Sequence, residues 1–301
     1  MYSPILILTV NYNQKQVTLE LLKSLQRCLE NFDTLIIDNG SKSEEKLNSK
    51  DYPTYKNIYV LNLDKNYGFT GGFNRGIEYF LNHKQYKYIL IINNDTEVDK
   101  NFIKPLLNTA EKYKNKDFII APRILFYNYK GKKDIIWFGG GYYNKLTGAT
   151  KHKNLYKTSY LEYTNISNDY LTGCTLFIPR HTLRKLGGFN NSFFAYSEDV
   201  DLSLRLKKIH GELIYEPKSV IWHKVSITAK KYSPLSFYLQ IRNSFWTTRL
   251  NLERRYLLSQ ILYFLIIRQF IWIGIAIIKG KNLKLIPSIY SGLYDGITKK
   301  I

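Results

Sequence analysis

The chain has 301 residues, of which 45% are hydrophobic and 23% charged, and these proportions exclude an intrinsically disordered protein. Lysine and arginine number 44 against 24 aspartate and glutamate, so the formal net charge is +20 and we expect an anionic partner such as nucleic acid, acidic lipid or a diphosphate-bearing substrate. The two cysteines, Cys28 and Cys174, are far apart without metal-ligand spacing, which excludes a disulfide framework and a zinc ribbon.

The first half of the chain alternates between strand and helix patterns. Ile5 to Val10 is an apolar run typical of a strand buried on both faces, and it is too short for a signal sequence, so we expect a cytoplasmic protein. Apolar residues from Gln16 to Leu29 recur at helical spacing, with Cys28 packed on the apolar face. A second strand follows at Thr34 to Ile37.

The same alternation continues to residue 121. The further elements are strands at 58–61, 88–92 and 118–121 and helices from Gly71 to Leu81 and from Phe102 to Tyr113. Repeated units of this kind predict an α/β fold with a doubly wound sheet, and ligands of such sheets bind at the carboxyl ends of the strands.

The segment from about 125 to 168 is rich in Tyr, Lys, Gly and Asn. We interpret it as loops and short antiparallel strands of an acceptor-side lobe, although a solvated irregular insert fits equally well. The remaining elements that we expect are strands at 171–178, 213–215 and 220–222 and helices at 180–186 and 200–209.

The composition changes after residue 230. Between Tyr256 and Ile278 the chain is almost wholly apolar, and its length is near the roughly 20 residues that span a bilayer. Arg268 in mid-segment would cost about 3 kcal/mol at the bilayer centre, so we prefer helices that lie in the membrane interface. A buried helix that completes the core is the alternative. The flanking cations, each contributing about 1 kcal/mol with anionic lipid, are Arg254, Arg255, Lys279, Lys281 and Lys284.

Two polar motifs follow strands in the first third of the chain. Asp38 lies between Leu35-Ile36-Ile37 and Asn39-Gly40-Ser41, where its carboxylate could accept hydrogen bonds from a pyrimidine imide or a ribose; a turn cap is the alternative. Asn66 to Gly76 joins a strand to a helix, so its amides could face a diphosphate. It is neither a P-loop nor the dinucleotide fingerprint of a first strand.

Three further groups could perform chemistry. Asp95, which follows a buried strand, could ligate a divalent cation that substrate phosphates also hold, and His223 at a later strand end could complete a Mn²⁺ or Mg²⁺ site. A packed histidine is the ordinary alternative. Glu198 and Asp199, with Asp201 nearby, form an acidic cluster whose mutual repulsion suits a general base; helix capping is the alternative.

Residues 4 to 228 resemble the inverting glycosyltransferase family 2 with its GT-A fold, a Rossmann-like, mixed, mostly parallel sheet flanked by helices. Within it the chain looks most like a rhamnosyltransferase branch. The resemblance implies a domain at 1–230, with a nucleotide-binding half at about 1–122 and an acceptor-side half at about 123–230, and a helical extension at 231–301. The matching stretches are Val10 to Asn13, Ile37 to Ser41, Asn66 to Gly76, Asn93 to Asp95, Leu171 to Cys174, Gly187 to Phe189 and Phe193 to Asp201.

The resemblance also implies roles for single residues. Asp199, paired with Glu198, would be the catalytic base, Asp95 the metal-binding end of a D-x-D motif, and His223 the residue that closes the metal site. Asn93 replaces the first Asp of that motif. The residues implied to bind the nucleotide sugar are Asn11, Tyr12, Asp38, Asn39, Asn66, Gly71, Gly72, Asn74, Asn94 and Gly173.

The expected activity is transfer of a sugar, with dTDP-rhamnose the preferred donor and a UDP-hexose the alternative, to a lipid-linked or polysaccharide acceptor of cell-surface glycan synthesis. We expect the protein on the inner face of the cell membrane. Two alternatives come from other classes. A polyanion-binding or nucleic-acid-binding protein would explain the charge but lacks a compact basic motif, and a sugar nucleotidyltransferase would need a basic glycine-rich loop after the first strand.

Overall fold

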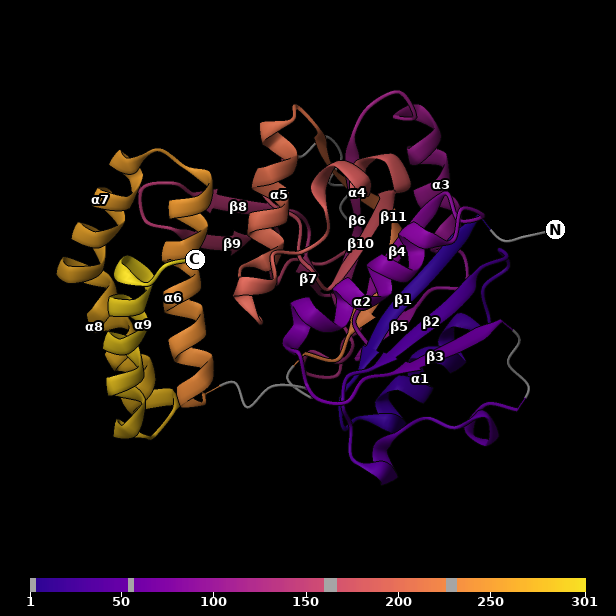
Figure 1. Ribbon diagram of the computed structural model, residues 1–301, viewed down its shortest axis with the longest axis horizontal. Coiled ribbons are helices and arrows are strands. Elements are labelled where there is room, and N and C mark those ends of the chain that lie inside the picture. Colours follow the sequence, from indigo (N-terminus) through magenta and orange to yellow (C-terminus); the bar gives the residue numbers. More distant parts are fainter. Residues whose placement is uncertain (1–3, 54–56, 160–166, 226–231) are drawn as a thin grey trace.

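The computed structural model describes residues 4–53, 57–159, 167–225 and 232–301, and it places a large sheet beside a group of helices (Figure 1). The sheet has nine strands in the order β3-β2-β1-β4-β10-β6-β11-β5, with β7 paired to β6. The strands are β1 (Ile5–Asn11), β2 (Asp33–Asp38), β3 (Ile58–Asn62), β4 (Tyr88–Ile92), β5 (Thr96–Val98), β6 (Phe118–Phe126), β7 (Ile136–Phe138), β10 (Thr175–Pro179) and β11 (Glu212–His223).

The pairing directions make this a mixed, mostly parallel sheet. β1 pairs in parallel with β2 and β4, β2 with β3, and β6 with β11, whereas β10 runs antiparallel between β4 and β6. Because β1, β2 and β4 run the same way, their polar carboxyl ends meet at one edge of the sheet, which is where ligands of such folds bind.

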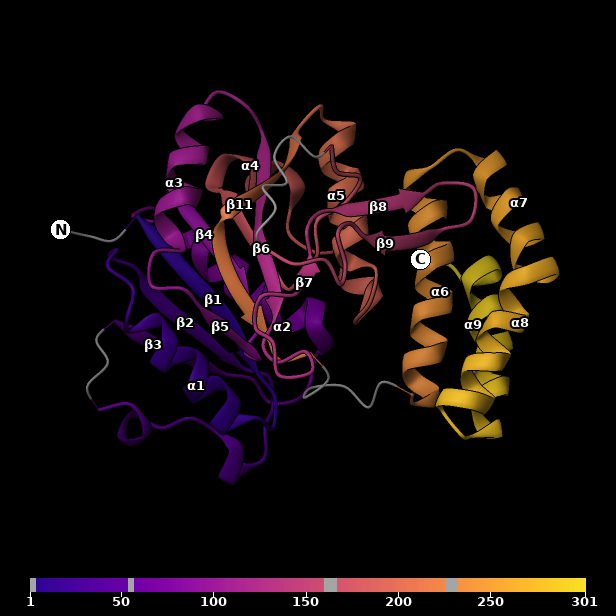
Figure 2. The same cartoon turned by 180° about the vertical axis from the view of Figure 1, so that it is seen from behind.

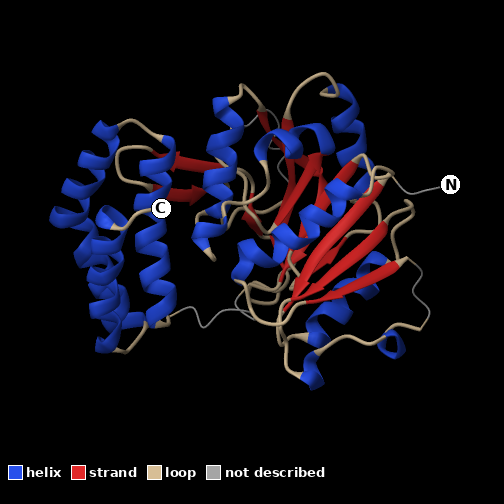
Figure 3. Ribbon diagram, in the orientation of Figure 1, coloured by secondary structure: helices blue, strands red, loops and turns tan. Residues whose placement is uncertain are grey.

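Helices flank the sheet (Figure 3). They are α1 (Lys15–Leu25), α2 (Gly68–Asn82), α3 (Ile103–Lys112), α4 (Arg180–Leu186) and α5 (Glu198–Lys208). The core between these layers is apolar, and Leu8, Ile37, Phe80 and Ile91 are almost completely excluded from solvent. Burial of that kind stabilises a fold by about 25 cal/mol per Å² of apolar surface. The predicted fold class is confirmed.

Several predicted boundaries were wrong because tertiary contacts decide where an element ends. α1 stops at Leu25, so Cys28 follows the helix and Leu29 is 76% exposed instead of packed. β6 continues to Phe126 because it pairs with β11 along its whole length, and β11 is one strand with a bulge between Glu216 and Val220 where the pattern predicted two.

Other elements begin at residues that the pattern did not predict. α2 starts at Gly68, whereas the pattern predicted a helix only after Gly71, and α5 starts at Glu198, two residues before the predicted Val200. β10 starts at Thr175 and leaves residues 171–174 outside the strand. The early start of α5 matters for function because it places Glu198 and Asp199 in the first helical turn.

The C-terminal helices form a bundle with a small core of its own. They are α6 (Pro234–Asn251), α7 (Arg254–Tyr263), α8 (Gln269–Gly274) and α9 (Ile286–Thr298), with π-helical turns at Phe264–Arg268 and Ile275–Lys279. Phe237, Ile241, Phe245 and Phe264 pack in this core. The predicted boundary between 230 and 231 falls in segment 226–231, outside the described residues.

One helical segment of the bundle is unusually apolar. Arg254–Lys279 is 26 residues long, its most apolar 18-residue stretch has a mean hydropathy of 2.2, and it alone among the described helices is long and apolar enough to cross a membrane. Only 11% of its most apolar stretch is buried. The helix therefore does not complete a core on all sides, which was the alternative interpretation of its sequence.

A hairpin connects the sheet region to the bundle. Its strands, β8 (Gly141–Asn144) and β9 (Ala149–His152), project toward α6 and α7 (Figure 2). The Tyr143 hydroxyl lies 3.1 Å from Thr248 Oγ1, and Asn251 Nδ2 donates to Asp201 Oδ1 at 2.7 Å. These contacts hold the bundle beside the β8–β9 hairpin and α5.

Candidate active site

The ends of β1 and β2 are joined by side-chain hydrogen bonds. Asn11 Nδ2 donates to Asp38 Oδ2 at 2.8 Å, and the Ser41 amide donates to Asp38 Oδ1 at 2.9 Å. Asn11 and Asp38 are both completely buried, whereas Tyr12 is 42% exposed. The turn cap predicted as the alternative for Asp38 is thus present, and binding of a base by this group stays a prediction.

The glycine-rich segment is anchored in a similar way. Asn39 Nδ2 donates to Asn66 Oδ1 at 3.0 Å and to the Gly68 carbonyl at 2.9 Å, while the Tyr67 amide donates to Asn39 Oδ1. These bonds fix the start of α2 against the end of β2. A Cβ on Gly72 would lie 3.1 Å from Asn39 Nδ2, so a larger residue would crowd this turn. At Gly71 the crowding atom would be Tyr67 Cβ, at 2.6 Å.

Asn74 makes its side-chain hydrogen bonds to a different part of the molecule, the loop after α4. Its Nδ2 donates to the Phe189 carbonyl and to Asn191 Oδ1, each at 2.7 Å, and its Oδ1 accepts from the Phe189 amide at 2.9 Å. Both ends of the amide therefore cross-link α2 to the loop after α4. The contacts identify Asn74 as a positioning residue, and its predicted role in lining the nucleotide has no support from them.

The end of β4 meets the end of β11. Asp95 Oδ1 lies 3.2 Å from His223 Nε2, and both side chains are largely buried. Burial would lower the pKa of His223, but Cys174 and Asp95 raise it to about 10. Asn94 Nδ2 donates to Thr18 Oγ1 at 3.1 Å and to Gln14 Oε1 at 3.2 Å, which ties this turn to α1.

The Asp95–His223 pair has the donor atoms of a small divalent-cation site. A carboxylate oxygen and a neutral imidazole nitrogen suit Mn²⁺ well, so a cation bound here would displace the proton that Cys174 and Asp95 favour on His223. Within the residues that the structure describes, no three His, Cys, Asp or Glu side chains are arranged to hold a metal by themselves. A cation here would therefore need further ligands from a substrate, as the sequence predicts for a diphosphate.

A strained loop presents Glu198 and Asp199. Phe194, Tyr196 and Ser197 have φ values of 62°, 70° and 67°, a region that side chains disfavour. Asn243 of α6 compensates, because its fully buried Nδ2 lies 3.0, 2.7 and 2.8 Å from the carbonyl oxygens of Phe193, Ala195 and Tyr196 respectively. A residue of the C-terminal bundle thus holds the loop that precedes the predicted catalytic base.

The two carboxyl groups have different surroundings. Asp199 accepts hydrogen bonds from the amides of Gly173, at 2.9 Å, and Val200, at 2.8 Å. Burial raises the pKa of Asp199, and these bonds oppose the rise. Burial and the neighbouring Asp199 raise the pKa of Glu198 well above its ordinary value, and Glu198 Oε2 has no hydrogen-bond partner among the described residues. Asp199 is therefore the better candidate for an ionised base.

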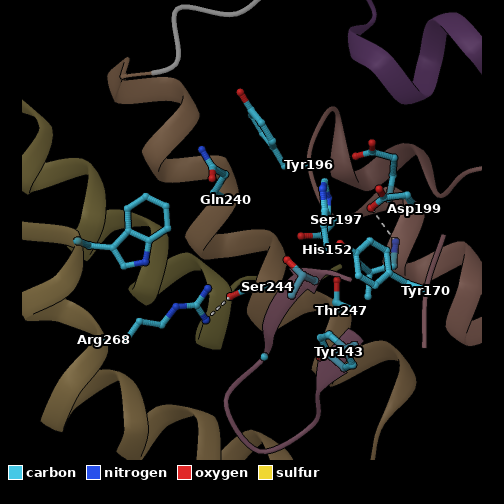
Figure 4. Close-up of a pocket in the computed structure, with 15 residues that line it drawn as sticks. Tyr143, His152, Tyr170, Tyr196, Ser197, Asp199, Gln240, Ser244, Thr247 and Arg268 are labelled. Atoms are coloured by element: carbon cyan, nitrogen blue, oxygen red, sulfur yellow. Dashed lines mark hydrogen bonds between the residues drawn. The ribbon is translucent and has the colours of Figure 1, made fainter. Parts of the chain in front are cut away.

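Asp199 borders a pocket of about 240 Å³ between the sheet region and the bundle (Figure 4). Hairpin residues Tyr143, Thr150 and His152 form one wall, together with Tyr170. Burial lowers the pKa of His152 to about 4, so its neutral ring can donate from Nδ1 to the Trp137 carbonyl at 3.0 Å. The opposite wall consists of Gln240, Ser244 and Thr247 of α6 with Arg268 and Trp272.

Sequence reasoning missed this second wall. Arg268 was predicted to lie at a membrane interface, yet its Nη1 donates to the Thr147 carbonyl at 3.1 Å and to Ser244 Oγ at 3.3 Å. The signal in the sequence was the isolated cation within an apolar segment, which indicates a polar environment on one side of the helix. The hydrophilic residues of α6 gave no comparable signal.

Comparisons with known proteins agree with the geometry. The family model for Glycosyl transferase family 2 matches residues 6–185. The low-salt glycan biosynthesis hexosyltransferase Agl10 of Haloferax volcanii is 25% identical over 248 residues, which are 79% of this chain and 73% of that protein. The N-acetylglucosaminyl-diphospho-decaprenol L-rhamnosyltransferase of Mycobacterium tuberculosis is 24% identical over 244 residues, 74% of this chain and 77% of that protein.

Solved structures share the fold. GalNAc-T7 with UDP, GalNAc and Mn²⁺ superimposes with a TM-score of 0.63 at 18% identity, over 80% of this chain but only 47% of that longer one. The mannosyltransferase PcManGT of Pyrobaculum calidifontis, in complex with GDP-Man and Mn²⁺, has a TM-score of 0.58 at 10% identity over 100% of this chain and 77% of its own. Both likenesses support the GT-A architecture.

Proposed function

The chain belongs to glycosyltransferase family 2, whose members transfer sugar from nucleotide donors, and we propose that this member inverts the anomeric carbon of a dTDP-deoxyhexose, with rhamnose as first choice. The mycobacterial relative is a rhamnosyltransferase, and this likeness supports rhamnose. A UDP-hexose is the second candidate, and the hexosyltransferase name of the haloarchaeal relative favours it.

The observation that carries the proposal is the position of Asp199 at the pocket wall. Its carboxylate is held by two backbone amides, so it cannot swing away from the pocket without breaking both bonds. The pocket is large enough for part of an acceptor, and Asp199 would contact the acceptor hydroxyl there. A preoriented carboxylate of this kind is suited to general base catalysis.

The reaction is a single displacement. Asp199 removes the proton of the acceptor hydroxyl, and the oxygen forms a bond to the anomeric carbon. The bond between that carbon and the diphosphate oxygen breaks, and its electron pair leaves with the nucleoside diphosphate. Because the oxygen attacks from the side opposite the leaving group, the configuration inverts and no covalent glycosyl-enzyme forms.

Asp95 and His223 are the residues that would hold a divalent cation, Mn²⁺ or Mg²⁺. Their separation of 3.2 Å and their burial fit a site that a donor diphosphate completes. When bound, the cation supplies positive charge that stabilises the leaving diphosphate. Asp38, Asn39 and the start of α2 would form the adjoining nucleotide site.

The acceptor is proposed to be lipid-linked, and the protein to be peripheral on the inner face of the cell membrane. Arg268 and Gln260 tie the long apolar helix to the β8–β9 hairpin, because Arg268 bonds to Thr147 and Gln260 lies against Gly148. One side of this helix packs against the pocket region of the same protein. Such a helix would lie in the membrane interface more readily than it would cross the membrane.

An acceptor-dependence assay tests the proposal. The protein is incubated with dTDP-rhamnose, UDP-glucose or GDP-mannose, with or without a short-chain N-acetylglucosaminyl-diphospho-lipid, and released nucleoside diphosphate is measured. We expect release that depends on the acceptor for one donor, and a product whose anomeric configuration by NMR is opposite to that of the donor. Absence of acceptor-dependent release with all three donors, or retention of configuration, contradicts the proposal.

A further inference from the structure

Arg268 occupies an unusual position in the pocket. It belongs to the apolar segment Arg254–Lys279, yet its side chain reaches inward and lies across the pocket from Asp199 (Figure 4). Nη1 makes both of its hydrogen bonds, to the Thr147 carbonyl and to Ser244 Oγ. A guanidinium has five N–H donors, so most of its donor capacity is available to a ligand.

Arg268 forms no ion pair with a carboxylate among the described residues, although Glu198 and Asp199 line the same pocket. Burial lowers the pKa of Arg268, and the Tyr263 and Tyr143 hydroxyls oppose that shift. A partly buried cation without an anionic partner is costly to maintain. Such a cost is ordinarily offset when a ligand supplies the missing negative charge.

The surroundings of Arg268 identify the rest of the ligand. On the same helical segment, Leu265 and Ile271 lie three residues before and three residues after Arg268, next to it on the helix surface, and are 47% and 50% exposed. A ligand that places an anionic group on Arg268 would therefore find an exposed apolar surface close by. This combination of one buried cation and adjacent exposed apolar side chains fits an amphiphile better than a free sugar or a free anion.

We propose that Arg268 binds the phosphate of a lipid-phosphate acceptor and so sets the acceptor specificity of this enzyme. The proposal rests on the proposed function, since it concerns the acceptor whose hydroxyl Asp199 would deprotonate. The phosphate lies on Arg268, the sugar extends across the pocket toward Asp199, and the apolar chain follows the exposed side of the helix. Guanidinium groups pair well with phosphate because two N–H donors match two phosphate oxygens.

Calorimetry with octyl phosphate below its micellar concentration tests the proposal without requiring turnover. Wild type and Arg268→Gln are titrated with octyl phosphate, inorganic phosphate and octyl glucoside. We expect Arg268→Gln to weaken octyl phosphate binding by about tenfold or more, because a charge-assisted bond is lost, and Arg268→Lys to restore part of the affinity. Inorganic phosphate should bind more weakly than octyl phosphate, and octyl glucoside should bind equally to both proteins.

Arg184→Gln is the matched control, since Arg184 is exposed on α4 outside this pocket. It should bind octyl phosphate as wild type does. Equal affinity of wild type and Arg268→Gln overturns the proposal, and so does inorganic phosphate binding as tightly as octyl phosphate. Nucleotide binding is measured on the same samples. A variant that still binds nucleotide is folded, so its loss of octyl phosphate affinity reports on Arg268 alone. Failure of the wild type to bind any nucleotide would contradict the proposed function and not the role of Arg268.

Discussion

The two ends of the proposed active site, the donor end and the acceptor end, are built differently. At the donor end, the polar side chains of the sequence motifs bond mainly to one another, as Asn11 does to Asp38 and Asn39 to Asn66. At the acceptor end, Glu198 Oε2 has no hydrogen-bond partner among the described residues, and Arg268 lies across the pocket from Asp199 without forming an ion pair with a described carboxylate. The donor end is thus a rigid frame for the backbone, whereas the acceptor end retains polar groups that a substrate would satisfy.

This difference separates two uses of polar residues. A buried amide or carboxylate that is fully bonded fixes the positions of turns and of amide groups. A buried polar group without a partner costs stability, and proteins retain such groups chiefly where they function. Substitutions at the acceptor end should therefore affect turnover more than folding, and substitutions in the frame should do the reverse.

The largest effect is expected at Asp199. Asp199→Asn removes the proposed base but keeps a side chain of the same shape, so the turnover number should fall by about 10² to 10⁴. Nucleotide affinity, measured by calorimetry, should change little. Asp134→Asn is the control, because Asp134 does not line the pocket. Wild-type turnover in Asp199→Asn would exclude this residue as the base.

Asn243→Ala tests whether the bundle controls the catalytic loop. The change leaves the carbonyls of Phe193, Ala195 and Tyr196 without their donor, and it should lower the free energy of unfolding by about 1 to 3 kcal/mol in urea titrations. The turnover number should fall as well, since Asp199 follows the same loop. Gln240→Ala on the same helix removes a similar amide that has no such bonds, and it should leave stability almost unchanged.

Membrane binding should depend on the cations at the end of the apolar segment. Replacing exposed Lys281 and Lys284 with Gln should weaken binding to vesicles containing anionic lipid by about 1 kcal/mol for each charge, as measured by co-sedimentation. Neutral vesicles should bind both proteins equally. Lys104→Gln with Lys112→Gln on α3 provides the control. Equal losses in the two double variants would argue against a membrane-facing bundle.

The smallest effect concerns the pH dependence of stability at Glu198. Because the pKa of Glu198 is raised in the folded state, folded protein retains this proton at pH values where unfolded protein has lost it. The contribution of Glu198 to the free energy of unfolding therefore becomes less favourable as the pH rises above the pKa that Glu198 has in the unfolded chain. Glu198→Gln removes this cost, so it should raise the melting temperature at pH 8, by about 2 °C or more for each kcal/mol gained in the free energy of unfolding. The rise in melting temperature should be smaller at pH 4.5. An equal shift at both values would contradict the assignment.

The sheet could be predicted from the sequence because its signals are local. Runs such as Ile5 to Val10 and Ile89 to Ile92 are buried on both faces, and each is followed by a polar turn. Helix and strand ends were less predictable. The length of β6 depends on its pairing with β11, and α1 ends at Leu25 although the helical spacing of apolar residues continues to Leu29, which is 76% exposed. Neither boundary is encoded in the local pattern.

The motif residues of the site could be predicted from the sequence, whereas the wall of the pocket formed with the bundle could not, again because only local signals can be read from a sequence. Asp38, Asp95 and Asp199 could be proposed because each lies in a short motif beside a strand or helix end. Tyr143 lies about a hundred residues or more before Ser244 and Arg268 in the chain, and it meets them only because the β8–β9 hairpin packs against α6 and the apolar segment Arg254–Lys279. No periodicity or spacing within the sequence predicts a contact of this kind between distant segments.

The most direct test of the account is calorimetric titration of dTDP, UDP and GDP into wild type and Asp95→Ala, each with and without Mn²⁺. The account predicts that Mn²⁺ tightens the binding of one nucleotide to wild type, and that Asp95→Ala loses this gain while it still folds. Binding of none of the three nucleotides, or an equal effect of Mn²⁺ on both proteins, would contradict a nucleotide-sugar site at the ends of β4 and β11.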